Sequence, residues 1–277
     1  MNIGSLDDYS GNGASLRPML KVQDLVMKYG DRAAVCGLSF EVVPGSIVAF
    51  LGPNGAGKTT TIKALTTQVK PTKGTVELNG IDVAMYPNQA RKYFGVVFQE
   101  ASLDHRLTAY ENLDFYGVLY KVPRKSRNVR IEELLRLFAL WDRKSDLVGK
   151  FSGGMRRRLE IARCLLHSPK IIFMDEPTLG LDPQTRRHLW SQIKILNERD
   201  GVTVFLTTHQ MEEAEQIAHW IYIIDHGQVI AQGTAENIRE QTASATLDDA
   251  FIALTGKAIR PDAVDGQSRQ FVPTGRG

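Results

Sequence analysis

The chain has 277 residues, of which 43% are hydrophobic, so it is long enough to bury the core of one large domain or two modest ones. Its formal net charge of +3 is too small a surplus to indicate a nucleic-acid-binding surface. The two cysteines, Cys36 and Cys164, lack the paired spacing of a zinc site or a disulfide framework, which favours a reduced, cytosolic setting.

The two ends of the chain differ in composition from its centre. Residues 1–18 are rich in glycine, serine and asparagine and lack the basic start and apolar run of a signal peptide, and residues 257–277 are rich in glycine, proline and charge. We expect both ends to be loosely ordered. The apolar runs between them fall far short of the roughly 20 residues that a membrane-spanning helix needs. Any contact with a membrane is therefore expected to go through a partner.

The segment from Leu20 to Val43 has the pattern of half-buried strands. Apolar side chains fall on every second residue there, at Leu38, Phe40 and Val42. Further along, Thr75 to Leu78 with the following Asn79-Gly80 predicts a tight hairpin, because asparagine and glycine tolerate the positive φ values of its turn. Together these segments predict an antiparallel β layer near the N-terminus.

Four short apolar runs show no alternation, which is typical of strands buried on both faces of a parallel sheet. The runs are Ser46 to Leu51, Lys170 to Met174, Val202 to Thr207 and Trp220 to Ile224. From Thr108 to about Leu147 the periodicity is helical, and its apolar positions i, i+3, i+4 and i+7 are Ile131, Leu134, Leu135 and Phe138. The pattern predicts an α/β fold with a mainly parallel sheet, an N-terminal antiparallel β layer and a helical insert at about residues 100–160, within one domain over residues 19–256.

A phosphate-binding motif follows the first of these runs. Gly52-Pro53-Asn54-Gly55-Ala56-Gly57-Lys58-Thr59 matches G-x-x-x-x-G-K-[ST], and a helical stretch begins at Thr60. Backbone N–H groups and the helix N-terminus of such a loop face a β-phosphate, so nucleotide-binding residues are expected at 52–60, in a P-loop NTPase core. Lys58 is expected to bridge the β- and γ-phosphates, and the Thr59 hydroxyl to bind Mg²⁺. The alternative is a glycine-rich turn with a solvated lysine.

Two further strand ends carry candidate catalytic residues. The apolar run 171–174 ends in Asp175 and Glu176, at the sheet edge where α/β proteins bind ligands. Asp175 suits a Mg²⁺ shell, and Glu176 suits a catalytic base that orients and deprotonates the attacking water. His209 follows the run 202–207 and is a candidate contact of the γ-phosphate. The structural alternatives are exposed loop acids and a strand-end histidine that bonds to nearby backbone.

The order of the motifs resembles that of ABC ATPases over roughly residues 20 to 255. In chain order they are the phosphate loop, Gln99, Phe151-Ser152-Gly153-Gly154-Met155, Asp175-Glu176, Gly180-Leu181-Asp182 and His209. The resemblance implies ATP and Mg²⁺ as cofactors, Tyr29 stacked on adenine, and Gln99 in contact with Mg²⁺ and the water. It also implies a second ATPase subunit, expected to be identical, with Asp182 at the subunit contact. The residues that it places on the ATP of that second subunit are Ser152, Gly153 and Gly154.

These residues also have ordinary structural interpretations. On the local sequence alone, Ser152 and Asp182 are helix N-caps, Tyr29 packs on a strand, and Gln99 is a solvated loop residue. Phe151 and Met155 stand where the family more often has leucine and glutamine. Methionine cannot donate the hydrogen bonds of an amide, so the contact that a glutamine makes with ATP is not carried over.

Residues 155–160, 178–183 and 246–256 resemble the drug, antibiotic and lipo-oligosaccharide export branch of ABC ATPases. The resemblance implies an ATPase that powers export of a drug-like, lipid-like or oligosaccharide substrate through a separate membrane permease, at the cytoplasmic face of the cell membrane. No nucleic-acid partner is expected. The alternatives are a soluble ABC ATPase that acts on ribosomes or DNA, and a P-loop GTPase or small-molecule kinase.

The stretch after Gln99 predicts a contact with the permease. The resemblance places a groove there that receives a short cytoplasmic helix, and the candidate lining residues are Tyr110, Leu113, Phe115, Tyr116, Leu119 and Tyr120. Ordinary core of the helical insert is the alternative. A basic run follows at Lys121, Arg124, Lys125, Arg127 and Arg130. It is interpreted as a solvated face, and contact with anionic lipid headgroups is the alternative.

Overall fold

The computed structural model describes residues 17–99 and 102–256. The strands are β1 (Leu20–Tyr29), β2 (Arg32–Val42), β3 (Ile47–Leu51), β4 (Lys73–Leu78), β5 (Ile81–Asp82), β6 (Phe94–Val97), β7 (Ile171–Asp175), β8 (Thr203–Thr208), β9 (Trp220–Asp225) and β10 (Gln228–Gly233). The helices are α1 (Lys58–Leu65), α2 (Pro87–Ala90), α3 (Ala109–Leu119), α4 (Arg124–Leu137), α5 (Gly153–Cys164), α6 (Pro183–Asp200), α7 (Met211–Ile217), α8 (Ala235–Thr242) and α9 (Leu247–Thr255). Apart from Arg17 and Pro18, the ends that were expected to be loosely ordered lie outside the described residues. Among the helices of the described ranges, none combines the length and apolar character needed to cross a membrane.

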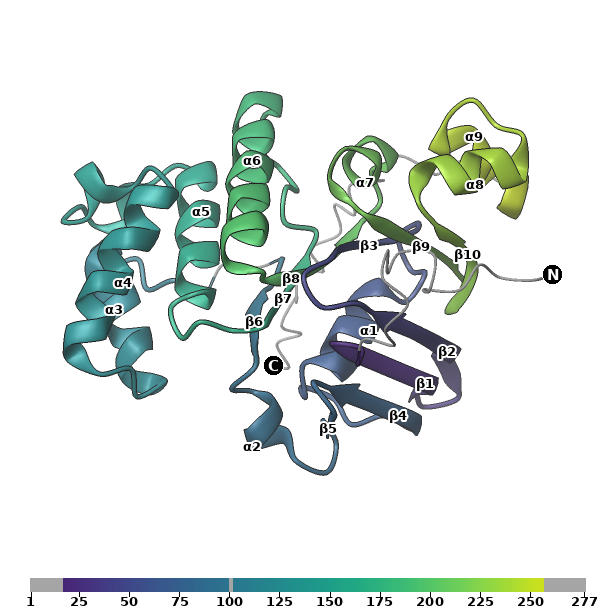
Figure 1. The fold of residues 1–277 in the computed structure, drawn as a ribbon, viewed down its shortest axis with the longest axis horizontal. Coiled ribbons are helices and arrows are strands. Elements are labelled where there is room, and N and C mark those ends of the chain that lie inside the picture. Colours follow the sequence, from purple (N-terminus) through teal and green to yellow (C-terminus); the bar gives the residue numbers. More distant parts are fainter. Residues whose placement is uncertain (1–16, 100–101, 257–277) are drawn as a thin grey trace, which may run out of the picture.

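Two sheets form the body of the protein (Figure 1). The antiparallel sheet has the order β2-β1-β4-β5, and the six-stranded sheet has the order β10-β9-β3-β8-β7-β6. In the second sheet, β6, β7, β8, β3 and β9 are parallel, whereas β10 pairs antiparallel with β9. The predicted α/β fold, with a mainly parallel sheet beside an antiparallel layer, is therefore confirmed.

The hairpin predicted at Asn79-Gly80 joins β4 to β5 in the antiparallel sheet. Both turn residues have positive φ angles, 49° for Asn79 and 73° for Gly80. The register pairs Leu78 with Ile81 across the turn, as expected for a two-residue connection. The predicted hairpin is confirmed.

The six-stranded sheet is buried on both faces, and this explains its unbroken apolar runs. In β3, Val48 and Phe50 pack with α1 and the antiparallel sheet, whereas the alternating Ile47, Ala49 and Leu51 pack on the opposite face. Aromatic rings join the two sheets, because the ring of Phe40 in β2 lies 5.4 Å from that of Phe50, centroid to centroid. Burial on both faces anchors the strand ends that carry the polar site residues.

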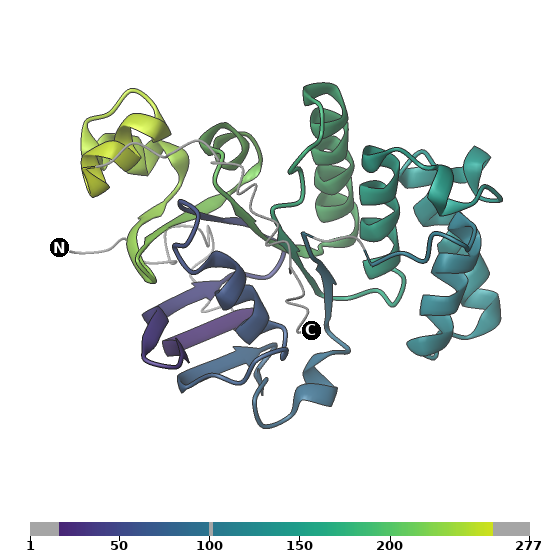
Figure 2. The ribbon, with the colours of Figure 1, turned by 180° about the vertical axis from the view of Figure 1, so that it is seen from behind.

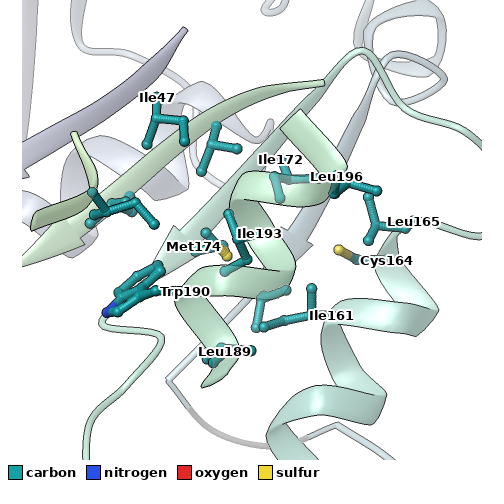
Figure 3. Packing of buried hydrophobic residues seen from close by; sticks show 14 of the residues in the cluster. Ile47, Ile161, Cys164, Leu165, Ile172, Met174, Leu189, Trp190, Ile193 and Leu196 are labelled. Atoms are coloured by element: carbon teal, nitrogen blue, oxygen red, sulfur yellow. The ribbon is translucent and has the colours of Figure 1, made fainter. Parts of the chain in front are cut away.

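Helices α5 and α6 cover the face of the sheet opposite α1. Figure 3 shows Ile172 and Met174 of β7 packed beside Ile193 and Leu196 of α6, with Ile161 and Cys164 of α5 next to them. All six side chains are buried. This packing fixes α5 against β7, the strand that ends at Asp175.

The helices α3, α4 and α5 form one end of the molecule, away from α8 and α9 (Figures 1 and 2). The four predicted core positions of this part, from Ile131 to Phe138, are fully buried. Helix α3 begins with a capping box, in which Thr108 accepts from the Glu111 N–H at 3.1 Å and the Glu111 carboxylate accepts from the Thr108 N–H at 2.8 Å. The predicted helical periodicity is confirmed.

The basic run after α3 differs from the predicted solvated face. The Arg127 side chain is mostly buried and its Nε donates to Asp114 at 2.6 Å. Arg130 forms ion pairs with Glu133 at 2.7 Å and with Asp200 at 3.6 Å. The interpretation was wrong for these two residues, because their carboxylate partners on α3, α4 and α6 draw them inward. Lys121, Arg124 and Lys125 are exposed, as predicted.

Candidate functional site

The loop between β3 and α1 needs glycine at two points. A Cβ at Gly52 would overlap the backbone oxygen of Ile224 in β9. At Gly57, φ is +103°, and a Cβ would lie 2.5 Å from the backbone oxygen of Ala34. The loop can therefore lie tightly over the start of α1, so the first N–H groups of the helix point toward the loop.

Lys58 is buried in this loop, with 5% of its surface exposed. Its Nζ donates to the Gly52 carbonyl at 2.8 Å and the Pro53 carbonyl at 3.2 Å. The same nitrogen lies 3.3 Å from Glu176 Oε1. A buried ammonium needs such partners, and an anion entering the loop would add to them. The loop is therefore built to hold negative charge.

Glu176 is held in place from several sides. Its backbone is left-handed, with a φ of 44°, and its N–H donates to the Thr207 carbonyl at 3.2 Å and the Thr207 hydroxyl at 3.1 Å. His209 Nδ1 lies 3.2 Å from the same Oε1 that faces Lys58. Burial raises the pKa of Glu176, but the hydrogen bond with His209 and the charge of Lys58 outweigh it, so this pKa is lowered. The carboxyl group is thus kept ionised.

Asp175 is the last residue of β7 and is almost fully buried. Its Oδ1 accepts a hydrogen bond of 2.6 Å from the Thr207 hydroxyl. The strand register explains the contact, because Asp175 pairs directly with Thr207 of β8. Thr207 therefore orients both acids of the site. Thr207 was not predicted as a site residue, because its only sequence signal is a hydroxyl near the end of a strand that also contains Thr203 and Thr208.

A cavity of about 830 Å³ brings nine of the predicted site residues together. Its lining residues include Tyr29, Asn54, Gly55, Gly57, Lys58, Thr59, Thr60, Gln99 and Glu176. Tyr29 is the last residue of β1 and is half exposed. Gly52 and Asp175 are buried and are not among its lining residues. The cavity combines an aromatic ring, a lysine and a carboxylate, which suits a base-bearing anion.

The predicted metal ligands are Thr59, Gln99 and Asp175. Within the described ranges, no group of three or more histidine, cysteine, aspartate or glutamate side chains forms a metal cluster. The Thr59 hydroxyl, the Gln99 amide oxygen and the Asp175 carboxylate are instead hard oxygen donors near a phosphate loop. Such a set suits Mg²⁺, which takes few protein ligands together with substrate phosphates.

Four predicted residues do not line this cavity and lie at the starts of α5 and α6. They are Ser152, Gly153, Gly154 and Asp182. Ser152 caps α5, where its Oγ accepts from the Met155 N–H at 3.2 Å. Asp182 caps α6 and accepts from the Thr185 hydroxyl at 2.6 Å. The hydrogen bond from Thr185 lowers the pKa of Asp182. The two caps adjoin each other, because a Cβ at Gly154 would lie 2.7 Å from Thr185 Cγ2. The structural interpretation as N-caps is thus confirmed for both.

A second cavity, of about 550 Å³, lies beside α3 and is here called the α3 groove. Phe115, Tyr116, Leu119 and Tyr120 line it, as do Phe94, Phe98, Ser102 and Arg163. Phe115 and Leu119 are 59% and 58% exposed. Two predicted lining residues are not part of it, because Leu113 faces the core and the Tyr110 hydroxyl donates to Asn128 of α4 at 3.1 Å. The prediction was wrong for those two, which lie on other sides of the helix.

Known proteins of one family resemble this chain. The sequence profile of the family described as "ABC transporter" matches residues 35–179. The daunorubicin resistance ATP-binding protein DrrA3 of Streptomyces coeruleorubidus is 41% identical over 80% of this chain and 70% of its own length. The Nod factor export ATP-binding protein I of Ralstonia nicotianae is 43% identical over 80% of this chain and 69% of its own length. A dimeric ATP-binding cassette solved in a post-hydrolysis state with ADP and phosphate is 29% identical, with a TM-score of 0.70, over 78% of this chain and 98% of its own.

Proposed function

Since this chain belongs to the ABC transporter family and is an ATPase, we propose that it powers export of a drug-like, lipid-like or oligosaccharide substrate through a separate membrane permease. One observation carries the ATPase part. Lys58 Nζ and His209 Nδ1 both lie next to Glu176 Oε1, beside the phosphate loop. The export part is supported by the relatives, whose names assign them to drug resistance and Nod factor export. None of these relatives favours the ribosome or DNA alternative.

The loop residues 52–60 would hold the phosphates of ATP, and Tyr29 would stack on adenine at the other end of the cavity. Lys58 has its Nζ at the loop carbonyls, so it can turn from Glu176 to the β- and γ-phosphates without leaving its pocket. Thr59, Gln99 and Asp175 would hold Mg²⁺, which when bound neutralises charge on the phosphate oxygens. Each of these roles is an assignment that the geometry supports.

Glu176 would act as the catalytic base. Its carboxylate orients a water molecule and accepts a proton as the water oxygen bonds to the γ-phosphorus and the bond from that phosphorus to the β–γ bridging oxygen breaks. When Lys58 moves to the phosphates, Glu176 loses one of the partners that lower its pKa, so it becomes a stronger base. His209 remains beside Oε1 and keeps the carboxylate oriented.

A second copy of the chain would complete each site. Ser152 and Gly153 are exposed, and they are not among the residues that line the cavity of their own described chain. They open α5, so the helix N-terminus is available to the γ-phosphate of a partner's ATP. Asp182, at the start of the adjacent α6, would lie at the contact between the two copies. ATP bound between two subunits favours the closed dimer, and hydrolysis removes that bias.

The permease would dock in the α3 groove, which would place the protein at the cytoplasmic face of the cell membrane as a peripheral subunit. The exposed Phe115 and Leu119 support this, because large apolar side chains gathered on a surface mark interaction sites. With the permease co-expressed, Phe115→Ala and Leu119→Ala should each lower recovery of the protein in the membrane fraction. Val129→Ala is the matched control, since Val129 is 70% exposed on α4 and outside the groove. Equal recovery of all three variants would contradict the docking role.

The ATPase mechanism is tested by Mg-ATP-dependent dimerisation and phosphate release with Glu176→Gln. The variant should dimerise with ATP and release phosphate at least about 100-fold more slowly than the unaltered protein, because it keeps the shape of the site without the base. Glu212→Gln, at an exposed glutamate of α7, should leave both measurements unchanged. Full hydrolysis by Glu176→Gln, or ATP binding only as a monomer, would overturn the shared-site mechanism.

A further inference from the structure

Arg157 lies in the middle of α5 and is 8% exposed. Its guanidinium group has five N–H bonds, and the structure gives it five acceptors. Nε donates to the Pro177 carbonyl at 2.6 Å, and Nη2 donates to the carbonyls of Asp175 at 3.1 Å and Glu176 at 3.2 Å. Nη1 donates to the Phe98 carbonyl and, at 3.3 Å, to Glu160 Oε2. Every donor of this buried side chain therefore has a partner.

The acceptors belong to two segments that are far apart in the sequence. Asp175, Glu176 and Pro177 form the end of β7 with both proposed catalytic acids, and Phe98 directly precedes Gln99. Guanidinium is planar and rigid, so its N–H bonds have fixed directions. Arg157 therefore sets the distance between the residue before Gln99 and the backbone of Glu176.

Glu160, one turn further along α5, binds the chain on the other side of Gln99. It is 2% exposed. Its Oε2 faces Arg157, and its Oε1 accepts from the Ser102 N–H at 2.6 Å. Arg163 of the same helix donates to the Ser102 carbonyl at 2.7 Å. The described residues on both sides of Gln99, Phe98 and Ser102, are thus bound to one helix.

A purely structural ion pair is a weak explanation for this arrangement. Two buried charges are expensive to desolvate, and apolar side chains of similar volume commonly stabilise a fold as well or better. Here, apart from the bond between them, Arg157 and Glu160 form their hydrogen bonds with backbone groups close to Gln99 and Glu176. We propose that Arg157 and Glu160 form a positioning pair that fixes Gln99 relative to Glu176. This inference rests on the proposed function, in which Gln99 contacts Mg²⁺ and the attacking water.

The pair should affect turnover and leave ATP binding nearly unchanged. Neither residue is among those that line the described nucleotide cavity. Misplacing groups that act on the water weakens interactions made in the transition state, which lowers kcat, whereas KM follows the binding contacts. We expect Glu160→Gln and Arg157→Lys to lower kcat about tenfold and to change KM for ATP by less than about twofold.

Arg158→Lys is the matched control on the same helix. Arg158 is partly buried and donates to the Phe138 carbonyl at 2.9 Å, within the helical part of the molecule. It should lower the melting temperature in the same way as Arg157→Lys and keep kcat. If Arg158→Lys lowers kcat as much as Arg157→Lys, a general loss of stability explains both, and the positioning role is overturned.

Hydrogen exchange gives a readout without nucleotide or metal. In Glu160→Gln, exchange of the Ser102 amide should accelerate about tenfold, because its acceptor changes from a carboxylate to a weaker amide oxygen. Exchange in α1 should stay the same. Unchanged exchange at Ser102 would refute the claim that Glu160 holds this residue.

A double-mutant cycle connects the pair to Gln99. Gln99→Ala alone should lower kcat, and adding Glu160→Gln should lower it little further, because both changes remove the same interaction. Fully multiplicative losses would overturn the inference. If Gln99→Ala keeps the kcat of the unaltered protein, the proposed role of Gln99 fails, and the exchange of the Ser102 amide still decides whether the pair positions the chain beside it.

Discussion

Thr207→Val removes a single hydroxyl group from the centre of the site. Thr207 is fully buried, its hydroxyl donates to Asp175 Oδ1 at 2.6 Å, and the same oxygen accepts from the Glu176 N–H at 3.1 Å. Valine has nearly the same shape and no hydroxyl. The substitution therefore leaves the buried Asp175 carboxylate without this donor and creates no cavity.

The expected loss of stability follows from the type of hydrogen bond. A hydrogen bond to a charged group contributes about 1.5–3 kcal/mol to the free energy of unfolding. The Glu176 N–H keeps its second acceptor, the Thr207 carbonyl, at 3.2 Å, so it adds little to the loss. For a chain of this size, about 2 kcal/mol corresponds to a melting temperature roughly 4–8 °C lower. Since Asp175 and Glu176 both shift, kcat should fall about tenfold.

Calorimetry and phosphate release measure the two effects, and Thr207→Ser is the control. Serine keeps the hydroxyl and loses only the methyl group, so its kcat should stay within about threefold of the unaltered protein. If Thr207→Val melts at the same temperature and turns over at the same rate, the hydroxyl does not hold the acids. If Thr207→Ser loses as much activity as Thr207→Val, packing of the methyl group is the cause.

Three further variants test other parts of the site. Against the opposing effect of burial, His209 lowers the pKa of Glu176, so His209→Ala should move the acidic limb of the kcat/KM profile to higher pH, and an unmoved limb would contradict this. Tyr29→Ala should raise KM for ATP about three- to tenfold at constant kcat, with Tyr29→Trp near normal, and equal KM values would rule out stacking. Gly52→Ala should destabilise the nucleotide-free protein by roughly 1–3 kcal/mol in urea unfolding, because its methyl group would overlap a β9 carbonyl, whereas Gly153→Ala, with open space around it, should not.

The phosphate loop and the strand-end acids were predictable because their signals are local. The loop motif from Gly52 to Thr59 specifies both its own turn and the helix that follows. Asp175 and Glu176 end an apolar run, and the carboxyl ends of parallel strands meet at one sheet edge. A few adjacent residues are enough for each of these predictions.

Strands β6 and β10 were not predicted as strands, and each omission has a physical reason. β6 is four residues long and contains Gly95, where a Cβ would lie 2.5 Å from the Cys164 carbonyl of α5. β10 is an edge strand whose middle residues are only partly buried, and it exists by pairing with β9 across the turn at His226 and Gly227. β6 is shorter than the central strands, and β10 lacks the unbroken apolar run that reveals them.

The residues that orient the site depend on contacts between distant segments. Thr207 meets Asp175 through the register of β8 on β7, across 32 positions of sequence. The sequence shows Arg157 and Glu160 only as charged residues of a basic helix. Their burial follows from the packing of that helix against β7. Helix periodicity likewise did not show that Leu113 turns inward while Phe115 lies on the surface. The faces of an element and its partners are set by tertiary structure.

The left-handed backbone of Glu176 is a local strain that the site retains. A residue with a Cβ in this region raises the energy of the folded state by roughly 1–2 kcal/mol, which glycine would avoid. Glycine at this position would relieve the strain, but it would remove the carboxylate that faces the buried Lys58 ammonium and that hydrolysis needs. A stabilised version of this protein should therefore be engineered with Glu176 left unchanged.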